Sequence, residues 1–237
     1  MLRLAVSSAL LASMLSAATA LAAPDVAVTT CGQVLPARAH GVLASDLDCT
    51  GQPVGVVVGR GGKLSLGGFT LASGFNGIEC RGSCTVTGPG AINGGQAAVL
   101  SDKKVKVSSV TISSAVIYGV DGDIVELEGS TVTGTGYFAV QGRRSARISS
   151  SSISGGFGGA SVGRAIVEGS TVSAATFGIS GGSASVKDGS AIETTSGEPS
   201  AYAIRTVKKP HVASDSTCSG RSLRLGSGDS WGVCSLD

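Results

Sequence analysis

The stretch VELEGSTVTGTGYFAV, residues 125–140, decides the fold because close variants of it recur along the chain. It returns as ARISSSSISGGFGGA at 146–160 and as AIVEGSTVSAATFGI at 165–179. Each copy has a pair of apolar residues at positions i and i+2, then a short Gly/Ser bend, then a third aliphatic residue. Along the whole chain this third residue keeps a spacing of 19 to 21 positions, at Leu71, Ile92, Ile112, Val132, Ile153, Val172 and Ile192.

A repeat of about twenty residues with this alternation predicts short β-strands separated by turns. Apolar and polar residues alternate, as strands require, and Gly, Ser, Asp and Asn occupy the breaks, as turns require. A unit this small cannot bury its own apolar residues, so consecutive units must stack on one another. We therefore predict an all-β, single-chain parallel β-helix of about eight coils, roughly 38 Å tall at ~4.8 Å per coil. A β-sandwich is the main alternative, but a sandwich has no reason to maintain this register.

The segments LSLGGFTLASG (64–74), NGI (76–78) and VTGPGAING (86–94) resemble the opening coils of secreted, pectin-lyase-like parallel β-helix proteins. The resemblance extends over about residues 31 to 212 and rests on structural motifs. It implies a right-handed helix, in agreement with the handedness rule for parallel crossovers. The chain departs from the family at Ser65 and Phe69, where these proteins often carry Asp and His.

Residues 1–22 have the pattern of a cleavable secretory signal peptide. Arg3 precedes an apolar stretch from Leu4 to Leu15, and the small-residue site Ala20-Leu21-Ala22 follows. An uncleaved membrane anchor is the alternative, but the apolar stretch is shorter than the ~18 to 20 residues that a span requires. We therefore predict a secreted or periplasmic protein with no membrane span.

The composition excludes several classes of protein. Hydrophobic residues make up 42% of the chain and its 37 glycines follow no three-residue period, so neither disorder nor collagen fits. Without Arg3, the 18 basic residues fall to 17 against 16 acidic ones, a net charge of +1. This balance predicts no nucleic-acid partner.

Six cysteines in an exported chain predict three disulfides, and their spacing favours the local pairs Cys31 with Cys49, Cys80 with Cys84, and Cys218 with Cys234. A zinc site is the rival interpretation, but neither His40 nor His211 lies at a ligand spacing from a Cys pair. We expect no metal and no cofactor. The predicted domains are the signal peptide (1–22), an N-terminal cap (23–50), the β-helix (51–216) and a C-terminal cap (217–237).

Basic residues recur in the bend after the opening strand of successive repeats. Arg60 begins this row, and the candidate ligand-binding residues in it are Arg81, Lys103, Lys104, Arg143, Arg144 and Arg164. Such a row would bind sulfate, phosphate or uronate groups along a glycan. The alternative is a ladder of cross-coil ion pairs, because Asp123 interrupts the row and the next outward column runs Lys106, Glu126, Arg147.

Glu79 and Asp121 are the candidate carboxylates, because both lie in the outward column beside the opening strand. Two coils separate them, ~9.6 Å at strand spacing, with Leu100 between. That distance suits the two carboxyl groups of an inverting glycosidase, but the apolar Leu100 between them offers no polar group to hold the attacking water. The paired Asp of polygalacturonases, the arginine motif of pectate lyases and the Asp-Pro-His of epimerases are absent.

Aromatic residues precede the opening aliphatic column on most coils. Strand alternation predicts that Tyr118, Phe138, Phe177 and Tyr202 point inward as an interior stack. Phe75, Tyr137 and Phe157 remain as candidate surface rings for stacking on a sugar.

These features together favour a secreted structural or glycan-contacting module of the cell envelope or extracellular space. We expect it to be non-catalytic, since short links between columns leave no long insertions to wall a cleft. The expected partner is an anionic polysaccharide, bound at the basic bends and beside Glu79 and Asp121. The alternative is a polysaccharide lyase or glycoside hydrolase acting on acidic glycans.

Overall fold

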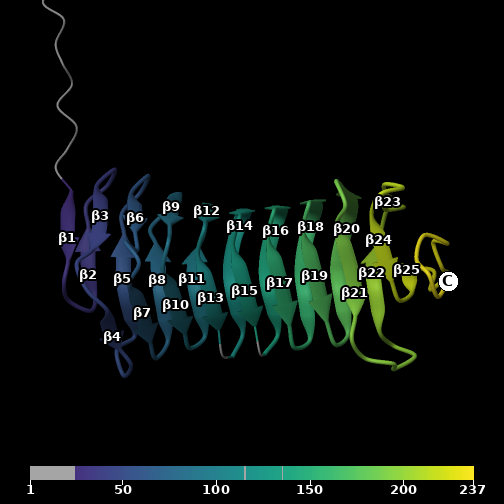
Figure 1. The fold of residues 1–237 in the computed structure, drawn as a ribbon, viewed down its shortest axis with the longest axis horizontal. Helices are drawn as coiled ribbons and strands as arrows, with labels where there is room; N and C mark the ends of the chain where they lie inside the picture. Colours follow the sequence, from purple (N-terminus) through teal and green to yellow (C-terminus); the bar gives the residue numbers. More distant parts are fainter. Residues whose placement is uncertain (1–24, 115, 135) are drawn as a thin grey trace, which may run out of the picture.

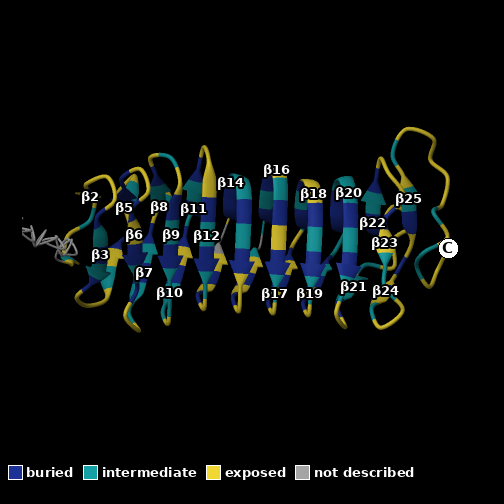
Figure 2. Cartoon of the chain, turned by 90° about the horizontal axis from the view of Figure 1, so that it is seen from above, coloured by how far each residue is buried: buried dark blue, intermediate teal, exposed yellow. Residues whose placement is uncertain are grey.

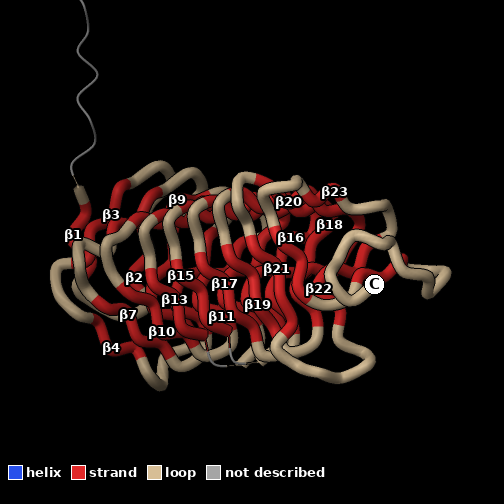
Figure 3. Tube along the Cα trace, turned by 45° about the vertical axis from the view of Figure 1, so that its right-hand side comes forward, coloured by secondary structure: helices blue, strands red, loops and turns tan. Residues whose placement is uncertain are grey.

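The computed structural model describes residues 25–114, 116–134 and 136–237, which wind into one parallel β-solenoid (Figure 1). The predicted signal peptide, residues 1–22, lies outside the described residues. Strands are joined by short loops around each coil, and the described residues contain no helix (Figure 3). The predicted all-β solenoid is therefore confirmed.

One face of the solenoid is a nine-stranded sheet that receives one strand from each coil. Its strands, from the N-terminal coil to the C-terminal coil, are β4 (Leu47–Cys49), β7 (Thr70–Ser73), β10 (Ala91–Gly94), β13 (Thr111–Ser114), β15 (Thr131–Gly134), β17 (Ser152–Gly155), β19 (Thr171–Ala174), β21 (Ala191–Thr194) and β24 (Thr217–Ser219).

The other two faces form a sixteen-stranded sheet. In the early coils each of these two faces has its own short strand. These strands are β1 (Val26–Val28), β2 (Gln33–Leu35), β3 (His40–Leu43), β5 (Val54–Val58), β6 (Lys63–Ser65), β8 (Asn76–Cys80), β9 (Cys84–Thr87), β11 (Ala97–Ser101) and β12 (Lys104–Ser108). In the later coils one long strand covers both faces, in β14 (Tyr118–Glu128), β16 (Phe138–Ser149), β18 (Gly158–Glu168) and β20 (Phe177–Lys187). The sheet ends with β22 (Tyr202–Thr206), β23 (His211–Val212) and β25 (Ser222–Arg224).

The nine strands of the first face give nine coils, one more than the sequence repeat indicates. The end coils escape the repeat because their spacing is longer. Leu47 pairs with Leu71, 24 residues on, and Ile192 pairs with Cys218, 26 residues on. The segments predicted as caps, 23–50 and 217–237, thus contain strands of the solenoid itself.

The interior is a set of aliphatic columns, with the same position of each coil contributing one residue. The third aliphatic residue of every repeat is 0% exposed, and each pairs with the next along the nine-stranded sheet. Full burial of one such side chain contributes ~1.5–3 kcal/mol. The repeat therefore encodes the core directly, while exposed residues gather at the bends (Figure 2).

A ladder of buried serines supports one bend of the later coils. The backbone N–H of Val110 donates to the Ser130 hydroxyl at 3.2 Å, and Ser130, Ser151 and Ser170 each donate likewise to the serine of the next coil. The hydroxyls of Ser130, Ser151 and Ser170 donate in turn to a carbonyl two residues earlier. These bonds satisfy backbone groups that the bend removes from the strand ladder.

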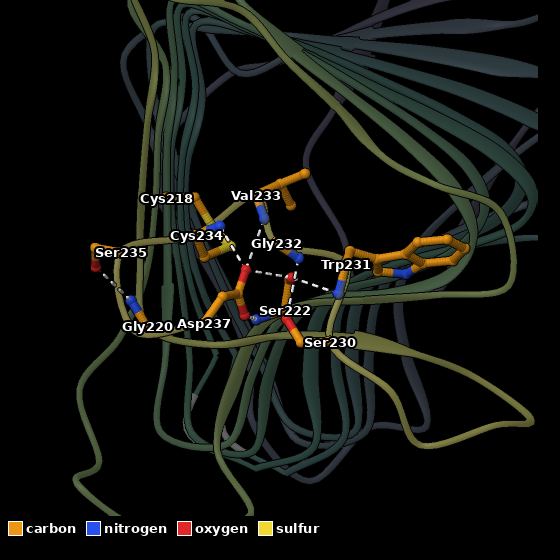
Figure 4. The surroundings of a disulfide bond; sticks show 10 residues. All are labelled: Cys218, Gly220, Ser222, Ser230, Trp231, Gly232, Val233, Cys234, Ser235 and Asp237. Atoms are coloured by element: carbon orange, nitrogen blue, oxygen red, sulfur yellow. Dashed lines mark hydrogen bonds between the residues drawn. A yellow bond between two sulfur atoms is a disulfide. The ribbon is translucent and has the colours of Figure 1, made fainter.

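The three predicted disulfides are confirmed as Cys31–Cys49, Cys80–Cys84 and Cys218–Cys234. Beside the last of these, the Asp237 carboxylate accepts hydrogen bonds from the backbone N–H groups of Ser222, Val233 and Cys234 at 2.6 to 2.7 Å (Figure 4). Burial opposes ionisation of Asp237, but these bonds and the Ser222 hydroxyl lower its pKa to about 2. The carboxylate thereby fastens the final segment to the last coil.

Candidate functional site

A groove of about 800 Å³ lies on the early coils. Four basic side chains line it, with two acidic ones and a floor of small and apolar residues. The basic residues are Arg60, Arg81, Lys103 and Arg143, the acidic ones Glu79 and Asp102, and the remainder Cys80, Gly82, Ser83, Leu100 and Ser101.

The groove exists because each early coil breaks its strand where the later coils do not. β5, β8 and β11 pair in register and end at Val58, Cys80 and Ser101, so their bends follow at one edge. Parallel pairing spaces these bends ~4.8 Å apart along the solenoid. Arg60, Arg81 and Lys103 lie in the three bends and therefore form a row parallel to the axis.

Local bonds fix the shape of these bends. The Cys80–Cys84 disulfide closes the bend that carries Arg81. The backbone N–H of Arg81 donates to the Val58 carbonyl at 2.8 Å, and the Ser101 hydroxyl donates to the Gly82 carbonyl at 2.9 Å. The backbone under the basic row is thus held by neighbouring coils on both sides.

The groove carries an excess of positive charge, with four basic side chains against two acidic ones. Within the described part of the chain, Arg60, Arg81 and Lys103 form no ion pair. All three are exposed, and they lie close enough to repel one another at low ionic strength. An anion in the groove would relieve this repulsion.

Arg143 closes one end of the groove by reaching across two coils. Its guanidinium donates to Asp121 Oδ1 at 3.0 Å and to the Ser101 carbonyl at 2.8 Å. The Asp121 side chain is 10% exposed and that of Arg143 is 43% exposed. Burial raises the pKa of Asp121, and the nearby Arg143 charge opposes this rise.

Several basic residues outside the groove lie in ion pairs. Lys106 contacts Glu128 at 2.9 Å, and Glu168 contacts both Arg147 at 2.6 Å and Lys187 at 2.7 Å. The hydrogen bond from Lys187, supported by the one from Arg147, lowers the pKa of Glu168. We call these five residues the ion-pair face.

The structure divides the eight candidate residues into three groups. Glu79, Arg81, Lys103 and Arg143 line the groove, and Asp121 lies behind Arg143. Lys104 pairs with Glu126 at 2.8 Å, and Arg144 pairs with Asp123 at 2.9 Å. Arg164 is exposed on β18, beyond the groove.

Arg60 and Asp102 belong to the groove but were not among the candidates. Arg60 stands first in the row of basic bends, so its position in the repeat was a usable signal. Asp102 carries no such signal, because its side chain reaches the groove only through the conformation of a two-residue bend.

The sequence predicts that Tyr118, Phe138, Phe177 and Tyr202 point inward. Phe138 and Phe177 are buried, each 7% exposed, whereas Tyr118 and Tyr202 are half-buried. The Arg205 guanidinium covers the ring of Phe177 at 3.9 Å, outside the cluster of core aliphatic residues. The inward position belongs to the next residue, since a side chain added at Gly119 or Gly178 would strike the core. The pairing skips this residue, so the chain turns a corner there and alternation fails for all four.

Two of the three candidate surface rings stack on each other. Tyr137 and Phe157 stack with their centroids 5.0 Å apart and their planes 3° from parallel. Each ring therefore covers one face of the other. Phe75, the third candidate surface ring, is 47% exposed.

Chemically, the groove can attract and orient an anion by charge and by hydrogen bonds from guanidinium groups. Among the described residues, no group of three His, Cys, Asp or Glu side chains could hold a metal ion, and no helix could cross a membrane. The three disulfides fit a protein that folds outside the cytoplasm. No protein-family model, curated protein or solved structure matches this chain.

Proposed function

We propose that the protein is a secreted, pectin-lyase-like β-helix module that binds an acidic polysaccharide in the groove without chemical change. The observation that carries this proposal is the contrast in pairing. Arg60, Arg81 and Lys103 have no ion-pair partner among the described residues, whereas Lys104, Arg144 and the ion-pair face are all paired. Glu79 and Asp102 line the same groove, so four basic side chains face two acidic ones, and this excess of positive charge favours an anionic ligand.

The test is binding of the purified protein to charged and neutral polymers. We expect dextran sulfate and polygalacturonate to bind and neutral dextran not to bind. Because the attraction is between exposed charges, affinity should fall steeply as the Debye length shortens from ~10 Å at 0.1 M salt to ~3 Å at 1 M. Equal binding of neutral dextran, or binding unaffected by salt, would contradict an anion-binding groove.

A second candidate is a polysaccharide lyase or glycoside hydrolase acting on acidic glycans. The observation that favours it is Asp121, a buried carboxyl with a raised pKa on the same column as Glu79. A general acid needs such a pKa. Release of unsaturated sugars or new reducing ends from polygalacturonate, abolished in Asp121→Asn and Glu79→Gln, would establish this activity over simple binding.

A further inference from the structure

Arg143 connects the groove to a buried acid. From its position in β16 the guanidinium reaches Asp121 on β14 and the Ser101 carbonyl on β11. It lines the groove on one side and a second hollow of about 360 Å³, formed with Gln141 and Ser161, on the other. The same exposed guanidinium therefore faces both solvent and the Asp121 carboxylate.

Asp121 depends on this one cation. The residues aligned with it on the neighbouring coils are Leu100 and Gln141, neither of which is charged. Tyr118 of its own strand is a neutral phenol whose pKa is raised, first by burial and then by the Asp121 charge. The next acid on the column, Glu79, lies two coils away. No described cation other than Arg143 forms an ion pair with Asp121.

We propose that Arg143 exchanges its partner on binding. An anionic group in the groove draws the Arg143 guanidinium away from Asp121, and Asp121 takes up a proton from solvent. This inference rests on the proposed function, because the incoming group is the sulfate or uronate of the bound glycan. The exchange leaves charge balanced: Arg143 pairs with the ligand, and the buried carboxyl becomes neutral. A carboxylate left nine-tenths buried without its partner is strongly disfavoured.

The exchange couples binding to pH, with a definite sign. The complex holds one proton more than the free protein, so affinity must rise as pH falls toward the pKa of free Asp121. The total gain in affinity is tenfold for each pH unit by which loss of the Arg143 contact raises the pKa of Asp121. Above that range the proton is absent, and Asp121 competes with the ligand for Arg143.

Dextran sulfate is the suitable probe, because its sulfate esters stay ionised over the range examined. We would measure its Kd from about pH 4.5 to about pH 7.5, between the ordinary Asp pKa and neutrality. The wild-type affinity should rise as pH falls. Asp121→Asn should bind more tightly than wild type at neutral pH and lose most of the pH dependence, because Arg143 is released permanently.

Two arginine variants complete the set. Arg143→Gln should weaken binding and abolish the pH dependence, whereas Arg144→Gln should behave as wild type, because Arg144 pairs with Asp123 outside the groove lining. Should Asp121→Asn fail to fold, calorimetric titration of the wild type in two buffers of different ionisation enthalpy counts the protons taken up directly.

The outcomes separate the two proposals. Binding that is lost in Arg81→Gln but independent of pH, with no proton uptake and with Asp121→Asn no tighter than wild type, overturns the exchange and leaves the anion-binding groove intact. A wild-type protein that does not bind dextran sulfate at any pH overturns both.

Discussion

The early and late coils share one plan but use charge in opposite ways. In the early coils the break between β5 and β6, β8 and β9, or β11 and β12 opens a bend, and the basic residues there are unpaired. In the late coils β14, β16, β18 and β20 run on without a break, and Arg144, Arg147 and Lys187 pair with carboxylates. Arg164 of β18 is the exception, since it is exposed and lies in no ion pair among the described residues. The exposed middle of β16, with Arg143 and Arg144, marks the transition (Figure 2).

The difference shows that the same repeat can carry two kinds of charged surface. On the ion-pair face each charge finds a partner of opposite sign on the adjacent coil, so the surface is electrostatically complete. In the groove three consecutive coils each carry a basic residue without an ion-pair partner among the described residues, and two carboxylates, Glu79 and Asp102, oppose four basic side chains. Under the proposed function, the early bends are the region where ligand binding outweighs stability, and the ion-pair face is the region where it does not.

Removing two positive charges from the groove should produce the largest change in binding affinity. Arg81→Gln with Lys103→Gln should weaken dextran sulfate binding at least about tenfold, because hydrogen bonds to charged groups contribute ~1.5–3 kcal/mol each. Its melting temperature should stay equal or rise, since like-charge repulsion is removed. Binding isotherms and thermal melts measure the two effects.

The matched control is Lys106→Gln with Arg147→Gln on the ion-pair face. It removes the same number of positive charges and so changes net charge equally. We expect nearly wild-type binding and a lower melting temperature. If the two double variants lose equal affinity, total charge rather than the groove governs binding, and the distinction between the regions fails.

Glu168→Gln should give the next largest effect, on stability alone. Glu168 contacts two cations that are themselves about half exposed, so solvent screening limits the expected loss to about 1 kcal/mol at neutral pH. Its folded pKa is lowered below the ordinary value of 4.5. The stabilisation is therefore present above that value and is lost as pH falls through it and below.

Urea unfolding of Glu168→Gln and wild type at neutral pH and near pH 3 measures this difference, which should shrink as pH falls because the Glu168 carboxylate then takes up a proton. Glu79→Gln is the control from the groove, where no ion pair to Glu79 is present among the described residues. An unfolding midpoint of Glu168→Gln equal to that of wild type at neutral pH would show that the ion-pair face contributes nothing.

The sequence predicts the features set by the repeat, namely register and core, but it does not predict which partners long side chains reach. Glu79, Leu100 and Asp121 lie in register on successive coils, as the repeat predicts. The core aliphatic columns and the three disulfide pairings also agree with the prediction. Cross-coil ion pairs were expected between direct neighbours such as Lys106 and Glu126. Lys106 instead contacts Glu128, two residues beyond its register partner, because long side chains lean along the strand.

Two features of the site have no signature in the sequence. Arg143 reaches back across two coils, which requires knowing the rotamer of a residue at a register shift in β16. The corner after Phe138 and Phe177 reverses the alternation that strand periodicity predicts. Both depend on local departures from a regular strand, and a repeat averaged over seven copies conceals such departures.

Arg164→Gln should have the smallest effect and so define where the groove ends. Lys103 and Arg164 lie three coils apart, about 14 Å at strand spacing, which exceeds the Debye length of ~10 Å at 0.1 M salt. Unlike Arg143, Arg164 does not line the groove. We expect its loss to change the Kd for dextran sulfate less than about twofold at 0.1 M salt, since Arg164, although one coil from Arg143, does not line the groove and lies beyond the Debye length from Lys103. A tenfold loss would place the late coils in the binding surface and extend the groove along the axis beyond Arg143.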